Sequence, residues 1–217
     1  MYKGIVWDLD GTLLDTLDDL TDAVNAALGM HGLPQKTKDE VRKAVGNGIR
    51  KLIERTVPAE TDEVTTNAVF VSFKEYYKDH MNDKTASYEG ITDLLRSLSD
   101  RGVRMAVVSN KADFATAELC RIYFGGVIDV AIGQRDGVPK KPSPDAVFTA
   151  LAELGVTAAE AVFIGDSDVD VLTGMNAGMD VIAVSWGFRT ADSLKAAGAD
   201  RIADTPKTLG EMLLSAR

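Results

Sequence analysis

Short apolar runs rich in β-branched residues recur along this chain, and each is followed by a glycine or polar turn and then by a helical pattern. Near-continuous apolar strands that alternate with helices are typical of a parallel sheet covered on both faces. The sequence therefore predicts an α/β fold with a parallel-sheet core. The predicted strands cover residues 4–7, 104–108, 126–132, 161–164 and 181–185, with 200–204 as a sixth candidate.

One interval interrupts this alternation. Residues 17–86 show helical patterning and no convincing strand, beginning with apolar side chains every three or four residues at Leu17, Leu20, Val24 and Leu28. Further helical patterns cover residues 38–45, 48–57 and 62–80. We therefore expect an inserted all-helical domain at residues 16–86, with a core built from residues 1–15 and 87–217.

The charge and cysteine content restrict the partners of the protein. A net charge of −9 disfavours nucleic acid and anionic membranes, because both are polyanions. The single cysteine, Cys120, cannot form an intramolecular disulfide, and neither a leader-like segment nor an apolar run of roughly 18 residues is found. We expect a cytoplasmic protein without a membrane segment, and the 217 residues are compatible with a monomer or a homodimer.

The first predicted strand ends in two aspartates, Asp8 and Asp10, separated by one leucine. Because side chains alternate along a strand, both point the same way, with Cα atoms roughly 6 to 7 Å apart if the strand persists to Asp10. Gly11 then allows the backbone to turn away. A strand-to-helix turn with an aspartate cap accounts for one of these carboxylates. Two that converge at the end of an apolar strand indicate a functional site.

Two later strand ends carry polar groups. Ser109 and Asn110 follow the strand at residues 104–108, where they either cap the next helix or bind phosphoryl oxygens. Lys141 precedes a proline that restricts it to extended conformations, so it is either a solvated loop lysine or a fixed cation beside an acidic site.

The strand at residues 161–164 is followed by Asp166 and Asp170, which share a face if the helix begins early. Ser167 and Asp168 could cap that helix. Ligands in open α/β sheets bind beyond the carboxyl ends of the strands, so we expect these carboxylates to meet those of Asp8 and Asp10 at one edge. Such crowding requires protonation or a cation, and an all-oxygen site suits Mg²⁺ better than Zn²⁺.

These motifs resemble, in order, those of the haloacid dehalogenase superfamily, within its phosphatase branch. The matching residues are Asp8, Asp10, Gly11 and Thr12 for the first motif, Ser109 for the second, Lys141 for the lysine, and Asp166 and Asp170 for the acidic pair. The resemblance covers residues 2–185 and implies a Rossmann-like core with a helical cap. Within the cap, Gly46, Asn47, Gly48 and Arg50 resemble the corresponding segment of phosphoglycolate phosphatases, as does the Trp-Gly-Phe-Arg stretch at residues 186–189.

The resemblance also implies a role for each matching residue. Asp8 is expected to attack the phosphoryl group, Asp10 to act as general acid and then as general base, and Lys141 to keep Asp8 ionised. Ser109 and the backbone amides near Leu9 and Asn110 are expected to bind the phosphate. Asp8, the backbone carbonyl of Asp10 and Asp166 are expected to hold Mg²⁺, with Asp170 supporting the metal. For Arg50, a solvated helix face is the favoured interpretation, and for Gly46 and Gly48 a turn between helices is the alternative.

The function expected from these residues is a Mg²⁺-dependent phosphatase that acts on a small phosphorylated metabolite, with 2-phosphoglycolate as the best single substrate. A β-phosphoglucomutase-like phosphotransferase and a pyrophosphatase on the same fold are alternatives, although Thr12 favours the phosphatases. A non-catalytic protein that binds a phosphorylated ligand is an alternative of another class. Retention of both a nucleophile and an acid argues against it.

Overall fold

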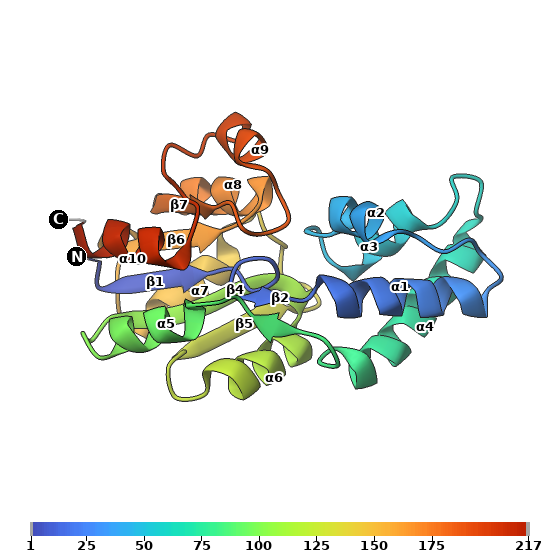
Figure 1. Ribbon diagram of the computed structural model, residues 1–217, viewed down its shortest axis with the longest axis horizontal. Helices are drawn as coiled ribbons and strands as arrows, with labels where there is room; N and C mark the ends of the chain where they lie inside the picture. Colours follow the sequence, from blue (N-terminus) through green and yellow to red (C-terminus); the bar gives the residue numbers. More distant parts are fainter. Residues whose placement is uncertain (1, 216–217) are drawn as a thin grey trace. The chain divides into compact units, whose positions relative to one another are not determined.

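The computed structural model describes residues 2–215, which form two compact units. One unit is an α/β core that combines the chain up to Leu14 with the chain from Ser87 onward, and the other is a helical unit at Asp15–Ala86 (Figure 1). The chain passes from one unit to the other at two short strands, β2 (Leu14–Asp15) and β3 (Ala86–Ser87). None of the helices formed by residues 2–215 combines the length and apolarity needed to cross a membrane.

The core is built on a six-stranded sheet in the order β5-β4-β1-β6-β7-β8, and every pair of neighbours is parallel. Its first strand, β1, lies in the interior of the sheet between β4 and β6. The segments that follow these three neighbouring strands carry candidate site residues, and all three leave the sheet at the carboxyl ends of the strands. The predicted α/β fold is therefore confirmed. The strands are β1 (Gly4–Trp7), β4 (Arg104–Ala112), β5 (Val130–Gln134), β6 (Ala161–Gly165), β7 (Asp180–Val184) and β8 (Ile202–Ala203).

Helices cover both faces of this sheet, because alternate strand residues are apolar on both sides. Ile5 and Trp7 point into one apolar cluster with α5, α6 and α10, whereas Val6 points into a second cluster with α7. The core helices are α5 (Ile91–Ser99), α6 (Asp113–Phe124), α7 (Asp145–Leu154), α8 (Asp168–Asn176), α9 (Ala191–Ala196) and α10 (Pro206–Ser215), with a short 3₁₀ turn at Ala158–Glu160.

Two strands differ from their predicted bounds. The strand predicted at residues 126–132 begins only at Val130, because Val127 and Ile128 turn back to hydrogen-bond the Phe124 carbonyl at the end of α6. The strand predicted to end at residue 108 continues to Ala112, with a register shift against β5 between Val108 and Ala112. This extension places three polar residues, 109–111, inside β4.

The helical unit consists of α1 (Leu17–Met30), α2 (Lys38–Ala44), α3 (Ile49–Thr56) and α4 (Glu63–His80). The helix face predicted at its start is confirmed, since Leu17, Leu20, Val24 and Leu28 are all buried. Caps define the later helices: Thr37 and Glu40 form a capping box on α2, and the Asp62 side chain accepts from the Thr65 amide at the start of α4.

A buried carboxylate in the helical unit joins the segment that follows α4 to the first turn of α1. Asp19, in the first turn of α1, accepts hydrogen bonds from the Lys84 amide at 2.9 Å and from the Thr85 amide at 2.8 Å. The Thr85 hydroxyl donates to the same carboxylate at 2.7 Å. Because buried amides must be paired, Asp19 fixes the chain that leaves α4 against the chain that enters α1.

Candidate active site

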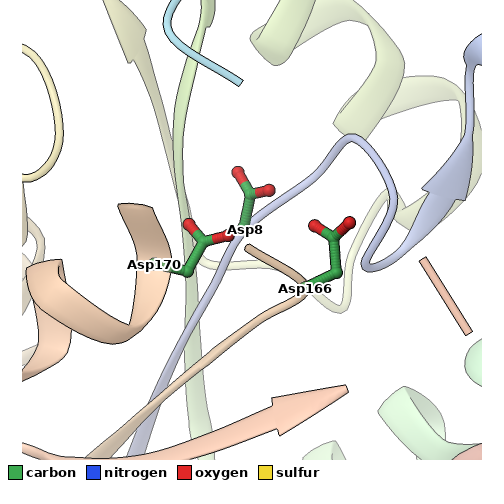
Figure 2. Close-up of side chains that lie close together, drawn as sticks. All are labelled: Asp8, Asp166 and Asp170. Atoms are coloured by element: carbon green, nitrogen blue, oxygen red, sulfur yellow. The ribbon is translucent and has the colours of Figure 1, made fainter. Parts of the chain in front are cut away.

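Three aspartates bring their carboxylates together beyond the carboxyl ends of β1 and β6. Asp8 directly follows β1, Asp166 follows β6, and Asp170 lies in the first turn of α8 (Figure 2). One oxygen from each lies within 4.8 Å of the others. All three side chains are buried, so their charges cannot be screened by bulk water.

A lysine from a distant loop lies against two of these carboxylates. Lys141 Nζ donates to Asp8 Oδ1 and to Asp170 Oδ1, both at 2.7 Å. Lys141 is therefore a fixed cation beside an acidic site and not a solvated loop lysine, because its side chain is only 4% exposed. Burial disfavours the ammonium, but the carboxylates of Asp170 and Asp8 outweigh that effect and raise the pKa of Lys141 above its ordinary value.

Asn110 holds Lys141 in place through the backbone. The Lys141 amide donates to Asn110 Oδ1 at 2.9 Å, and Asn110 Nδ2 donates to the Lys141 carbonyl at 3.2 Å. This reciprocal pair connects residues far apart in sequence. The Asn110 side chain therefore orients the cation, a contact that the sequence did not suggest.

Asp170 is fixed by the helix that carries it. Ser167 is the N-cap of α8, and its backbone amide donates to Asp170 Oδ2 at 3.1 Å while its hydroxyl donates at 2.6 Å. The other oxygen, Oδ1, accepts from Lys141. The capping role expected of Ser167 is confirmed, whereas Asp168 is half-exposed and lies outside the group of three carboxylates.

Asp166 is held by the segments that follow β1 and β7. The Thr12 hydroxyl donates to Asp166 Oδ1 at 3.2 Å, and the Phe188 amide donates to Oδ2 at 2.6 Å. Gly11 has a φ of +88°, and a Cβ there would overlap the Asp166 carboxylate. Both the backbone conformation and the close approach therefore require glycine at position 11.

Two of the buried carboxylates, those of Asp8 and Asp166, hold their protons unusually strongly. Burial, followed by repulsion from Asp170, raises the pKa of Asp8 from 3.8 to about 7, although Lys141 opposes this shift. Burial and the charges of Asp170 and Asp8 likewise raise the pKa of Asp166 well above its ordinary value. A single lysine does not neutralise three carboxylates, so the group fits a bound cation. Asp8, Asp166 and Asp170 could hold a metal ion, and oxygen donors suit a hard divalent cation.

We expect this excess of negative charge to make the metal-free protein less stable as the pH rises. Because the folded chain retains the Asp8 proton more strongly than the unfolded chain, the stability from that proton is complete below pH 3.8 and is lost as the pH rises through about 7. In EDTA, wild type should lose stability relative to the neutral variant Asp8→Asn between about pH 4.5 and about pH 8. Urea unfolding at several pH values measures this difference.

The titration of Asp8 also predicts how a divalent cation changes the stability of the protein. Metal binding requires ionised carboxylates, so Mg²⁺ should stabilise wild type more at about pH 8 than at about pH 5, where protons compete with it. In Asp8→Asn this stabilisation should be much smaller. A difference between the two proteins that does not change with pH in EDTA would contradict the assigned charge state.

The Asp10 carboxylate lies outside the group of three, whereas we expected all four to meet, but its charge is near enough to contribute to the raised pKa of Asp8. Strand β1 ends at Trp7, and the chain turns immediately after Leu9, whose carbonyl accepts hydrogen bonds from the amides of residues 12–14. The alternation that was expected to align Asp8 and Asp10 therefore stops before Asp10. Instead, Asp10 Oδ1 accepts from Lys111 Nζ at 3.0 Å.

The segment at Ser109 lies within a strand rather than at a helix cap. The N-cap of α6 is Ala112, without a side-chain cap hydrogen bond, so the interpretation of Ser109 or Asn110 as its cap is wrong. Ser109 is buried in the sheet edge beside β1, and its hydroxyl accepts from the Lys111 amide at 3.3 Å. Lys111 itself was not among the predicted site residues. A lysine two residues after the predicted phosphate-binding serine was the available signal.

The four candidates in the helical unit are tied to neighbours in that unit. Asn47 Oδ1 accepts from Arg55 Nη2 at 2.8 Å, and Gly48 is the N-cap of α3 with a φ of +82°. Gly46 also has a positive φ, of +122°. Arg50 donates to Glu54 and to Asn67, each at 3.1 Å, and its guanidinium lies 5.5 Å from the centre of the Phe70 ring.

Comparison with known proteins gives matches over nearly the whole chain. The family model described as haloacid dehalogenase-like hydrolase matches residues 5–184. A phosphoglycolate phosphatase of Caulobacter vibrioides is 34% identical over 219 residues, which cover 97% of this chain and 92% of that protein. An N-acetylmuramic acid 6-phosphate phosphatase of Pseudomonas aeruginosa is 30% identical, with 97% of this chain and 94% of that protein covered.

A solved structure extends this similarity to three dimensions. A Lactobacillus delbrueckii subsp. bulgaricus protein, provisionally described as a phosphoglycolate phosphatase, superposes with a TM-score of 0.94 at 36% identity. The superposition covers 99% of each chain. The similarity therefore includes both the parallel-sheet core and the inserted helical segment.

Proposed function

Since the chain belongs to the haloacid dehalogenase-like hydrolase family and is a phosphatase, we propose that it hydrolyses a small phosphomonoester through a phosphorylated Asp8, with 2-phosphoglycolate as the leading substrate. One observation carries the mechanism: the buried Asp8 carboxylate at the end of an interior strand, 2.7 Å from Lys141 and beside two further carboxylates. In this water-poor setting, Lys141 together with a bound cation would let the carboxylate approach a phosphoryl group that would otherwise repel it.

In the first proposed step, an oxygen of Asp8 forms a bond to phosphorus as the bond from phosphorus to the leaving oxygen breaks. Asp10 transfers its proton to that oxygen, so the alcohol leaves neutral. In the second step, Asp10 takes a proton from water, the water oxygen attacks phosphorus, and the bond from phosphorus to Asp8 breaks. Inorganic phosphate is released and Asp8 is regenerated, with Asp10 again carrying a proton.

The other residues of the core stabilise charge in this scheme. Lys141 keeps Asp8 ionised and offsets repulsion from the incoming phosphate. Ser109 and nearby backbone amides bind the oxygens of the transferred group, where positioned donors contribute most to phosphoryl transfer.

We propose Mg²⁺ as the metal, held by Asp8, Asp166 and the backbone carbonyl of Asp10, with Asp170 supporting the site. When bound, it neutralises charge on the phosphoryl oxygens. Asp170 already accepts hydrogen bonds from Ser167 and Lys141, which favours a supporting role over direct ligation.

We assign the helical unit as the cap that recognises the leaving group, with domain limits at residues 16–86. It is inserted directly after the segment that carries Asp8 and Asp10, so the chain enters it from the residues that perform the chemistry. Gly46, Asn47, Gly48 and Arg50 are the proposed recognition residues. Arg50 is the strongest of them, because a cation in an otherwise acidic protein suits an anionic leaving group.

The proposed partner is a small phosphorylated metabolite, and the proposed location of the protein is the cytoplasm. The single cysteine, Cys120, is buried, and burial raises the pKa of its thiol to about 12, so it has no reactive thiolate. A chain that relies on no disulfide suits a reducing compartment.

A panel of phosphomonoesters tests the function and the substrate together. The purified protein should release phosphate from 2-phosphoglycolate with Mg²⁺, and EDTA should abolish the release. The panel should include N-acetylmuramic acid 6-phosphate, since one relative carries that name, as well as pyrophosphate and β-glucose 1-phosphate. Greater activity on one of these would replace the leading substrate. Inactivity on every compound would favour a non-catalytic binding protein.

A further inference from the structure

Two buried lysines contact different aspartates of the site. Lys141 contacts Asp8 and Asp170, whereas Lys111 contacts Asp10, with Nζ 3.0 Å from Oδ1. The Lys111 side chain is only 3% exposed and the Asp10 side chain only 14%, so this is no surface ion pair. An ion pair removed from water carries a desolvation cost that a lysine chosen only for stability need not incur.

The backbone shows why Lys111 reaches this position. Strand β4 continues past Val108 with a shift in register against β5, and only then ends at Ala112. Bulges of this kind redirect side chains and are common beside active sites. Within this segment the Asn110 side chain holds Lys141, whereas the Lys111 side chain contacts Asp10.

The contact with Lys111 contributes to the orientation of Asp10. It lies in the turn between β1 and Gly11, where no strand ladder fixes it apart from a single bridge to Leu14. A carboxylate in that turn would be attracted toward any cation held by Asp8 and Asp166. The contact with Lys111 instead holds the Asp10 carboxylate to the side of β4, outside the group of three carboxylates.

We propose that Lys111 is a positioning residue that aims the Asp10 carboxyl group at the leaving-group oxygen. This inference rests on the proposed function, in which Asp10 transfers a proton to that oxygen. Fixing Oδ1 sets the plane of the carboxyl group, and therefore the direction in which its proton is delivered. Lys141 holds the carboxylate of the proposed nucleophile, Asp8, in the same way. Each lysine therefore orients one of the two reacting carboxyl groups.

A misdirected proton donor affects substrates according to their leaving groups. An alkyl ester such as 2-phosphoglycolate releases a strongly basic alkoxide and requires the proton, whereas p-nitrophenyl phosphate releases a stabilised phenolate and does not. The second step, in which Asp10 takes a proton from water, is the same for both esters, so the readout is the single-turnover rate at which Asp8 becomes phosphorylated. In Lys111→Met, this rate should fall about 10²-fold for the alkyl ester, as for other small misplacements of reacting groups. For p-nitrophenyl phosphate, it should fall less than about threefold, since that leaving group needs no proton.

The experiment compares wild type, Lys111→Met, Lys111→Arg and Asp10→Asn on p-nitrophenyl phosphate and on the alkyl ester that wild type hydrolyses best. Asp10→Asn should show the same selective loss, only larger. Lys111→Arg keeps the charge and should recover at least about tenfold of the alkyl-ester activity. Lys195→Met, which removes an exposed lysine of α9, is the matched control and should behave as wild type.

The outcomes separate the inference from the proposed function. If wild type hydrolyses neither ester, the proposed function fails. If wild type is active but the phosphorylation rate of Lys111→Met falls by the same factor with both esters, or with neither, the positioning role is wrong. A rise in KM for the alkyl ester with unchanged kcat would also overturn it, because it would make Lys111 a substrate-binding residue. Lys111→Arg no more active than Lys111→Met would contradict the charge contact.

Discussion

Asp8→Asn is expected to abolish phosphatase activity while leaving the protein folded. Removing a nucleophile that acts as a unit with its neighbours costs about 10⁴- to 10⁶-fold in kcat. The fold should persist, because asparagine has the shape of the protonated aspartate and burial already favours the neutral form of Asp8. The introduced amide oxygen can still accept from Lys141, and the substitution removes one of three mutually repelling charges.

Activity should be measured together with formation of the phosphorylated enzyme. Acid-quenched wild type should carry a phosphoryl group detectable by mass spectrometry, and Asp8→Asn should carry none. Asp192→Asn, a change at a side chain that is 97% exposed, controls for the loss of one negative charge. Turnover in Asp8→Asn above about 1% of wild type would reject the nucleophile, since this far exceeds what a lost nucleophile leaves.

The strands and the three clustered aspartates of the site could be predicted because they depend on short stretches of sequence. An apolar run followed by a turn marks each strand, and in a parallel sheet the carboxyl ends of neighbouring strands meet at one edge. That rule predicted that Asp8 would lie near Asp166 and Asp170, and their carboxylate oxygens lie within 4.8 Å of one another. The two segments are distant in sequence, since Thr12 and Asp166, which share a hydrogen bond, are 154 residues apart.

The contacts that orient the site could not be predicted, because each depends on a backbone detail that sequence patterns do not show. Lys111 reaches Asp10 only because β4 continues through a register shift, and the two residues lie 101 positions apart. The side chain of Asn110, a residue predicted to bind phosphate through its backbone amide, bonds the backbone of Lys141, and no sequence pattern indicated that contact. The position of Asp10 was mistaken for a similar reason, since a strand ending at Trp7 removes the alternation on which the prediction depended.

Lys141→Met is expected to destabilise the core unit strongly. Methionine fills a similar volume but leaves Asp8 and Asp170 without their shared cation. Breaking a buried ion pair in this way costs about 3 to 5 kcal/mol of unfolding free energy. Both tryptophans of the chain, Trp7 and Trp186, belong to the core unit, so tryptophan fluorescence during urea unfolding in EDTA reports this loss directly.

The size of the loss should depend on pH and on the partner carboxylates. At about pH 5 protonation relieves part of the repulsion, so Lys141→Met should cost less there than at about pH 8, where Asp8, whose pKa is about 7, must ionise. Asp170→Asn removes a second charge, and the double variant should be more stable than the sum of the single losses by about 1 to 3 kcal/mol. Lys195→Met should change stability by less than about 0.5 kcal/mol. Additive losses, or a cost independent of pH, would mean that Lys141 contributes packing rather than charge, and the nucleophile would then need another source of neutralisation.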